Sequence, residues 1–236
     1  MYMLKMSPII LSFDGNIGSG KSSIVKYFQK NFENYCEAND KKLNICFLEE
    51  PVSTWESIVD IDSGKNIIEN FYENNEKFSF QFQMMAYISR LSLIKKALEK
   101  NYDIIITERS IYTDRHIFAK MLFLDKKMSS IEWQIYNLWF DEFASIVQNI
   151  KTIYIRTLPE ICDTRIKKRN RQGETIPLDY LKNCHYYHDS WLNNLQNIEE
   201  GRVLIINGNQ ETNTSLFINN NFYDDTMNKV FKFMKN

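Results

Sequence analysis

Residues 15–22 read GNIGSGKS; they follow the apolar stretch 8–14 and lead into 22–32, where the apolar residues have helical spacing. A loop of this kind between a strand and a helix matches the pattern GxxxxGK[ST], in which backbone N–H groups and the start of the helix surround phosphate oxygens. The chain has only seven glycines, and three of them fall in this loop. The loop therefore predicts a phosphate-binding site after the first strand.

The loop and the serine that follows it are expected to hold the phosphates of a nucleotide. The residues concerned are Gly15, Asn16, Ile17, Gly18, Ser19, Gly20, Lys21, Ser22 and Ser23. In this motif the lysine reaches the outer phosphates and the next hydroxyl ligates Mg²⁺. GTPases, motor ATPases and small-molecule kinases all use such a loop, so phosphate binding alone leaves these classes open. The chain lacks an NKxD-type guanine-reading motif and an apolar strand that ends in Asp beside a water-activating residue, which disfavours the first two classes.

Five short stretches rich in β-branched and aliphatic residues recur along the chain, at 8–15, 42–51, 102–107, 151–157 and 201–208. Their nearly continuous apolar character is typical of strands buried on both faces of a parallel sheet. Stretches with helical spacing separate them, at 22–32, 78–100, 131–150 and 159–169. This alternation predicts an α/β fold with right-handed crossovers. Because there is no internal repeat and no long linker, we expect residues 1–236 to form one domain, with the Asn-rich stretch 207–225 as its most loop-like region.

The composition is that of an ordinary soluble protein, with 44% apolar residues, 14% aromatic residues and a net charge of -1. No charge bias indicates nucleic acid or a membrane surface, and no stretch approaches the roughly 20 apolar residues that span a bilayer. The four cysteines form no CxxC pair, so neither a zinc site nor a disulfide framework is indicated. We therefore expect a cytoplasmic protein with reduced thiols, whose partners include neither nucleic acid nor a membrane.

Acidic residues end two of the predicted strands. Catalytic groups in open parallel sheets gather at the carboxyl ends of the strands, where this chain has Glu49 and Glu50 after one strand and Glu108 and Arg109 after another. A carboxylate there can accept a hydroxyl proton from a phosphoryl acceptor, since phosphoryl transfer needs mainly positioning and charge neutralisation. Glu49 competes with Glu50 for this role, and Pro51, which fixes the chain just after Glu50, favours Glu50.

The stretch 78–98 reads as one long helix. It places Gln83, Ala86, Tyr87 and Arg90 at i, i+3, i+4 and i+7, so these side chains share one face. A glutamine amide offers both a donor and an acceptor, as recognition of the edge of a base requires.

Asp114 and Phe118 lie four residues apart on the next predicted helix. Arg90 and Asp114 could form a base-reading pair, and Phe118 could stack on the base. A structural ion pair and a core phenylalanine are also consistent with these residues taken singly.

Arg165, Arg169 and Arg171 precede a loop that contains a glycine. Cations beside such a segment suit a lid, at about 165–176, that closes over the phosphates of a nucleotide. A solvated basic helix face is the alternative interpretation.

Taken together and in order, six motifs resemble the deoxynucleoside kinases of the deoxycytidine, deoxyguanosine and deoxyadenosine type. They are GNIGSGKSS, EEPVSTW, FSFQFQ followed by ISR, ERSIYTDRHIFAKMLF, SIEWQIYNLW and IPLDYLKNCHYYHDSWL. The resemblance covers about residues 8–207. It implies an α/β P-loop kinase fold, with a five-stranded parallel sheet in the order 2-3-1-4-5, flanking helices and a short lid. It also implies a homodimer formed through helices, Mg²⁺ as cofactor, and ATP or another NTP as phosphate donor.

The resemblance also assigns roles to residues. Glu50 matches the general base that takes the proton of the sugar 5′-hydroxyl, Arg109 the arginine that steadies the 5′-oxygen and the transferring phosphate, and Glu108 the metal-associated acid. Lys21 completes the catalytic set, Ser22 shares the metal with Glu108, and Arg165, Arg169 and Arg171 match the lid arginines. The implied nucleoside-binding residues are Ile17, Glu50, Trp55, Tyr72, Phe82, Gln83, Arg90, Arg109, Asp114, Phe118 and Glu174.

Within this set, Gln83 matches the residue that hydrogen-bonds the base, and Trp55, Phe82 and Phe118 the aromatic residues that pack on it. Tyr72 matches the ligand of the 3′-hydroxyl. This chain is one residue shorter than the usual family lid between Arg165 and Pro177, so matching Glu174 to the second 3′-hydroxyl ligand depends on where the gap is placed.

The implied reaction transfers the γ-phosphate of ATP, or of another NTP, to the 5′-hydroxyl of a 2′-deoxynucleoside in nucleotide salvage. Arg90 and Asp114 match the members that use deoxycytidine or purine deoxynucleosides. Thymidine-accepting relatives have smaller or apolar groups at these positions, so thymidine is disfavoured.

Two alternatives remain. A nucleoside monophosphate kinase of the thymidylate type needs extra cations for the phosphate of its acceptor, whereas Glu50, Tyr72 and Glu174 suit hydroxyls. A catalytically inactive structural homologue should have lost Lys21, Glu50 or Arg109, and all three are present.

Overall fold

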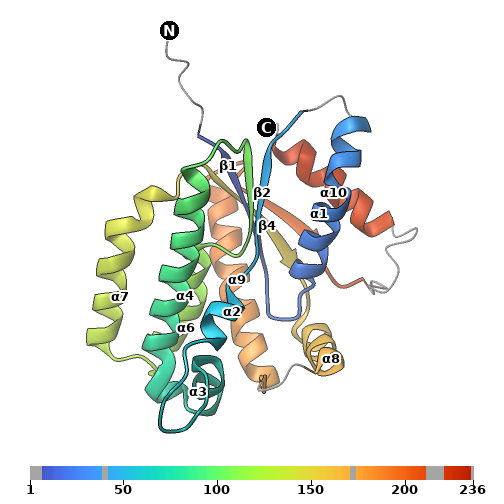
Figure 1. Ribbon diagram of the computed structural model, residues 1–236. Coiled ribbons are helices and arrows are strands. Elements are labelled where there is room, and N and C mark those ends of the chain that lie inside the picture. Colours follow the sequence, from blue (N-terminus) through green and yellow to red (C-terminus); the bar gives the residue numbers. More distant parts are fainter. Residues whose placement is uncertain (1–6, 39–41, 171–173, 211–220, 235–236) are drawn as a thin grey trace.

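The computed structural model describes residues 7–38, 42–170, 174–210 and 221–234, which build a parallel sheet between two layers of helices (Figure 1). All strand pairs are parallel and the strand order is β2-β3-β1-β4-β5, which confirms the predicted fold class. The strands are β1 (Ile9–Asp14), β2 (Ile45–Leu48), β3 (Ile104–Glu108), β4 (Ile150–Arg156) and β5 (Val203–Asn207).

Burial separates the central strands from the edge strands. Every residue of β3 is buried, as are all residues of β1 after Ile9, as expected for strands covered on both faces. All of β2 is only partly buried, and β5 has exposed residues, because these two strands form the edges of the sheet. The expectation of burial on both faces was therefore right for the centre of the sheet and wrong for its edges.

Helices α1 (Lys21–Ala38) and α10 (Asn221–Met234) cover one face of the sheet. The sequence analysis placed 221–225 in a loop-like region, and this expectation was wrong because α10 begins at Asn221. The helix buries Tyr223, Met227 and Phe231, which recur on one face, and Phe231 stacks on Tyr35 of α1. Packing against α1 therefore stabilises this helix, although the Asn-rich sequence that precedes it is typical of a loop.

Helices α4 (Asn75–Leu98), α7 (Ser130–Phe143) and α9 (Leu178–Ile198) cover the other face. Helix α7 begins at a capping box formed by Ser129 and Glu132. The predicted helix 131–150 was too long, since α7 ends at Phe143 and Asn149 has a left-handed φ of 52° just before β4. Among the described residues, no helix is both long enough and apolar enough to cross a bilayer.

Short elements connect the layers at the carboxyl ends of the strands. A continuous helical segment follows β3, and its middle turn, η1, is π-helical, a conformation often found at functional sites. These elements are α2 (Val52–Glu56), α3 (Ile67–Glu73), α5 (Ile111–Thr113), η1 (Asp114–Ala119), α6 (Lys120–Leu124) and α8 (Pro159–Arg169). A further short helix, η2 (Ala144–Ile146), instead precedes the start of β4.

Candidate active site

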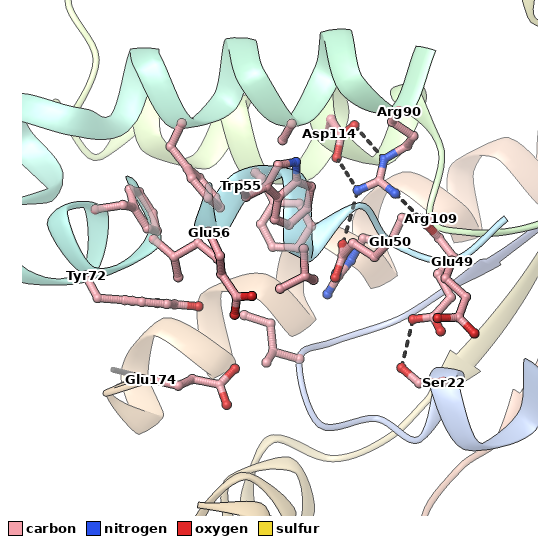
Figure 2. A pocket seen from close by; sticks show the side chains of 18 of the residues that line it. Ser22, Glu49, Glu50, Trp55, Glu56, Tyr72, Arg90, Arg109, Asp114 and Glu174 are labelled. Atoms are coloured by element: carbon pink, nitrogen blue, oxygen red, sulfur yellow. Dashed lines mark hydrogen bonds and ion pairs between the residues drawn. The ribbon is translucent and has the colours of Figure 1, made fainter. Parts of the chain in front are cut away.

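A cavity of about 410 Å³ lies at the carboxyl ends of β1, β2 and β3, where α/β sheets bind their ligands. Most of the residues singled out in the sequence line it (Figure 2). They are Ile17, Gly18, Lys21, Ser22, Glu49, Glu50, Trp55, Tyr72, Phe82, Gln83, Ala86, Arg90, Glu108, Arg109, Asp114, Phe118, Arg169 and Glu174.

The glycine-rich loop connects β1 to α1 and lies against α8. Gly18 has a φ of 76°, and a Cβ on it would stand 2.7 Å from the carbonyl oxygen of Cys162 in α8. This residue is therefore a glycine both for its backbone conformation and for the close approach of α8. The glycine clears space for a neighbouring helix as well as shaping the loop.

Lys21 is a buried cation at the start of α1. Its Nζ donates a hydrogen bond to the carbonyl oxygen of Asn16 at 3.1 Å. Burial lowers the pKa of Lys21 to about 8, and repulsion by Arg109 adds to this effect. A bound anion would offset both the burial of Lys21 and its repulsion by Arg109, so the charge of Lys21 favours a phosphate in the cavity.

Other residues of the loop hold its shape from behind the cavity. Asn16 is buried, its side-chain amide donates to the carbonyl oxygen of Leu181 at 2.8 Å, and its Oδ1 accepts from the N–H of Ile17. Five loop residues do not line the cavity, namely Gly15, Asn16, Ser19, Gly20 and Ser23. Backbone N–H groups of such residues can still face a phosphate, so their predicted role stays a prediction.

Glu50 is held between two arginines. Its Oε1 accepts hydrogen bonds from Arg109 Nη1 at 2.8 Å and from Arg90 Nη2 at 3.1 Å. Figure 2 shows these side chains gathered on one side of the cavity. Glu49, the competing candidate, also follows β2, but its side chain is exposed. This exposure favours Glu50 as the proton acceptor.

The two arginines control the charge of Glu50. Burial alone would raise the pKa of this carboxyl, but attraction by Arg109, Arg90 and Lys21 outweighs burial and lowers the pKa from 4.5 to about 2. Glu50 is therefore ionised at neutral pH. It is a fixed proton acceptor of low basicity.

Arg109 has a strained backbone and an unused donor. Its φ is 60°, a left-handed conformation that is uncommon for a residue with a side chain. The side chain lies with its guanidinium carbon 4.9 Å from the centre of the Phe118 ring, and its buried Nε has no hydrogen-bond partner among the described residues. Because an unpaired buried donor is costly, a substrate oxygen is the natural partner for this N–H.

Arg90 and Asp114 form a buried ion pair at the base of the cavity. Arg90 Nε donates to Asp114 Oδ2 at 2.9 Å, and Arg90 Nη1 donates to the carbonyl oxygen of Glu108 at 2.6 Å. Arg90 thus connects Asp114, Glu50 and the end of β3. The pairing suggested by the sequence is present, and it also orients Glu50.

An aromatic wall stands beside Gln83. Trp55 meets the edge of Phe82 with centroids 5.7 Å apart, and Phe82 stacks on Phe71 at 4.5 Å. Gln83 lines the same cavity and its amide makes no hydrogen bond to a described residue. A planar ring with a polar edge fits such a wall and such an amide.

The side chains of Ser22 and Glu108 meet at the phosphate end. Ser22 Oγ donates a hydrogen bond to Glu108 Oε2 at 2.8 Å. A hydroxyl and a carboxylate beside the loop are oxygen ligands of the kind that Mg²⁺ prefers, so these two residues fit the ion.

The α8 arginines have protein partners. Arg169 forms an ion pair with Glu174, and both line the cavity, where Figure 2 shows Glu174 on the side of Tyr72. Arg165 does not line the cavity, because its guanidinium donates to the carbonyl oxygens of Ser19, Gly208 and Gln210 at 3.0, 3.0 and 2.7 Å. The predicted role of Arg171, and that part of the expected lid, lie outside the described residues.

Nine of the described residues that line the cavity were not singled out in the sequence. They are Lys26, Val52, Ser53, Glu56, Asn66, Ile68, Glu69, Phe71 and Tyr180. Tyr180 lies within the motif IPLDYLKNCHYYHDSWL, which was a usable signal for it, whereas Phe71 directly precedes Tyr72 and lies in none of the quoted motifs.

Comparisons with known proteins identify the family of this chain. The family model for deoxynucleoside kinase matches residues 11–235. Deoxycytidine kinase 1 of Xenopus laevis is 34% identical over 193 residues, 77% of this chain and 73% of that protein. Deoxycytidine kinase of Homo sapiens is 30% identical over 241 residues, 95% and 90% of the two chains. Mitochondrial deoxyguanosine kinase of Xenopus laevis is 29% identical over 247 residues, 94% and 88%. The chain therefore belongs to the deoxynucleoside kinase family, a family of phosphotransferases.

Proposed function

We propose that the protein transfers the γ-phosphate of ATP, or of another NTP, to the 5′-hydroxyl of a 2′-deoxynucleoside. The proposal rests on the position of Glu50. Two arginines hold this carboxylate in the same cavity as the glycine-rich loop and the aromatic wall. The loop suits the donor phosphates and the wall suits a nucleobase. Glu50 lies where the acceptor hydroxyl must meet the γ-phosphate.

In the proposed reaction the 5′-oxygen attacks the γ-phosphorus, the bond from that phosphorus to the β,γ-bridging oxygen breaks, and the hydroxyl proton passes to Glu50. Because the pKa of Glu50 is about 2, proton removal is not what drives the attack; Glu50 fixes the direction of the hydroxyl and takes the proton as the new bond forms. Arg109 and Lys21 offset the charge on the transferring group. Mg²⁺, held by Ser22 and Glu108, would neutralise the donor phosphates.

The proposed acceptors are deoxycytidine and the purine deoxynucleosides. Gln83 offers a free amide, and Asp114, fixed by Arg90, offers a carboxylate to the exocyclic amino group that cytosine, adenine and guanine carry and thymine lacks. The relatives named above are deoxycytidine and deoxyguanosine kinases, which supports the same group. Such an activity would return free deoxynucleosides to DNA precursor synthesis.

The test uses the four deoxynucleosides and their four 5′-monophosphates as acceptors, with Mg²⁺ and ATP labelled at the γ-phosphate. We expect labelled monophosphates from deoxycytidine and the purine deoxynucleosides, with a lower kcat/KM for thymidine. Lys21→Ala is the inactive control. Label that enters only the monophosphate acceptors would overturn the proposal in favour of a nucleoside monophosphate kinase.

We also propose that the protein is a homodimer formed through α7. Ile131, Leu138 and Trp139 recur on its outer face and are 68%, 71% and 45% exposed, beside Ile88 on the neighbouring α4. An apolar strip of this kind marks an interaction surface. Leu138→Glu should convert the dimer to a monomer in sedimentation analysis, whereas Ile61→Glu, at a 96% exposed apolar residue away from α7, should not.

The compartment we propose is the cytoplasm. Cys36, Cys46, Cys162 and Cys184 are all free thiols, and three of them are buried, as suits a reducing environment. Fractionation of cells that produce the tagged protein tests this, and enrichment in mitochondria would contradict it.

A further inference from the structure

A second cavity, of about 400 Å³, lies behind the helical segment that carries Asp114 and Phe118. Tyr112 and His116 line the second cavity, while Asp114 and Phe118 line the active-site cavity, so the two cavities use opposite faces of α5 and η1. They share no lining residue among those described. The second cavity is therefore a separate space with the volume of a small-molecule site.

The walls of this second cavity are aromatic and aliphatic. The rings of His116 and Trp191 stack with centroids 5.1 Å apart and 18° between their planes, and the Tyr112 ring is nearly parallel to His116 at 6.4 Å. Val147 and Leu195 supply aliphatic surface. Parallel aromatic rings beside aliphatic side chains favour a flat apolar ligand over a branched one.

Two polar groups face this apolar surface without protein partners. Neither ring nitrogen of His116 nor the hydroxyl of Thr152 makes a hydrogen bond to any described residue, although Thr152 is only 4% exposed. Burial, helped by Arg115 and Lys120, lowers the pKa of His116 to about 4. The imidazole is therefore neutral at pH 7 and offers one donor and one acceptor.

The charged groups at the cavity neutralise each other. Arg202 Nε pairs with Glu199 Oε2 at 2.6 Å, and Arg202 Nη1 donates to the carbonyl oxygen of Ile150 at 2.9 Å. These are the charged residues in the cavity lining, so the site has no excess charge that would select an ion.

We propose that the second cavity binds a small, uncharged, planar heteroaromatic molecule of one or two fused rings. The ligand packs against the rings of Trp191 and Tyr112 and forms one hydrogen bond with a ring nitrogen of His116, through either its ring N–H or its ring nitrogen. The hydroxyl of Thr152 supplies a further polar contact.

The test measures benzimidazole, which has two fused rings, one N–H and one unprotonated nitrogen, by calorimetry and by saturation-transfer NMR at neutral pH. Binding is compared with the variant Gln148→Trp, which fills the mouth of the cavity from an exposed position. The matched control is Gln134→Trp, at an exposed position on α7 outside both cavities. We expect binding to the parent and to the control variant, and none to Gln148→Trp.

A second variant, His116→Phe, keeps a ring against Trp191 and removes both nitrogens. We expect it to weaken benzimidazole binding about tenfold, as the loss of buried hydrogen bonds would. The proposal is overturned if the parent does not bind at millimolar benzimidazole, or if Gln148→Trp binds as well as the parent. These measurements do not use catalysis, so their failure would leave the proposed kinase activity untouched.

Discussion

The two ends of the active-site cavity hold their arginines in different ways. At the acceptor end, Arg90 and Arg109 have side chains 3% and 8% exposed and are bonded to Glu50. At the donor end, the Arg169 side chain is 37% exposed and paired with Glu174, while Arg165 binds backbone carbonyl oxygens. Under the proposed function, the acceptor end is thus organised before any substrate binds, whereas arginines that bind the donor would exchange protein partners for phosphate oxygens. Catalytic rate should depend on the first end and donor affinity on the second.

The largest effect is expected for Glu50→Gln. The amide keeps the size of the side chain but cannot take the proton, so kcat should fall by about 100- to 10,000-fold with little change in the KM of the deoxynucleoside. Steady-state kinetics checks this, with the exposed Glu49→Gln as matched control. A kcat close to that of the parent would show that Glu50 is not the proton acceptor.

The next effect concerns the choice of base. The double variant Arg90→Met, Asp114→Ala removes both partners of a buried ion pair, opens space at the base and should raise kcat/KM for thymidine relative to deoxycytidine by about 10- to 200-fold. The single variant Arg90→Met leaves Asp114 buried without its partner, so its Tm should lie below that of the double variant. Continued rejection of thymidine by a folded double variant would place selectivity elsewhere in the cavity.

These variants rest on residues that the sequence alone brought together. Gln83 and Arg90 were found because helix periodicity fixes which side chains share a face, whereas Asp114 was found from its spacing to Phe118 on the next helix and from the family resemblance. The central strands and the glycine-rich loop were found because local sequence determines them. The features that could not be predicted depend on tertiary contacts. Helix α10 depends on packing against α1, and the guanidinium of Arg165 binds backbone carbonyl oxygens, which leave no mark in the sequence.

A smaller effect should appear in the pH dependence of stability. The pKa of Glu50 is about 2 in the folded protein against an ordinary 4.5, so its charge stabilises the fold fully above pH 4.5, and this contribution is lost as the pH falls through 2. The difference in unfolding free energy between the parent and Glu50→Gln should therefore be constant above about pH 5 and shrink below pH 4.5. Urea unfolding at stepped pH measures it. A difference that already changes between about pH 5 and 7 would show that the arginines do not hold the carboxylate as described.

The smallest effect on stability is expected at the donor end. Arg169→Gln breaks a partly exposed ion pair, so it should change the unfolding free energy by less than about 1 kcal/mol. The KM for ATP should rise by a larger factor than the KM for the deoxynucleoside, which can change only through Glu174, the carboxylate that loses its partner. Lys167→Gln, at a neighbouring exposed cation of α8 that does not line the cavity, is the control. An equal rise in both KM values would mean that the two ends of the cavity do not act separately.

Gly208 sets a limit on how the donor end can be redesigned. A Cβ there would lie 2.1 Å from Thr157 Oγ1 and 3.3 Å from the Ser19 carbonyl oxygen, an oxygen that also accepts from Arg165. The chain leaving β5 is therefore seated directly on the glycine-rich loop. A side chain at position 208 would meet Thr157, Ile155 and the loop backbone at once, so the end of β5 and the glycine-rich loop cannot be redesigned independently of each other.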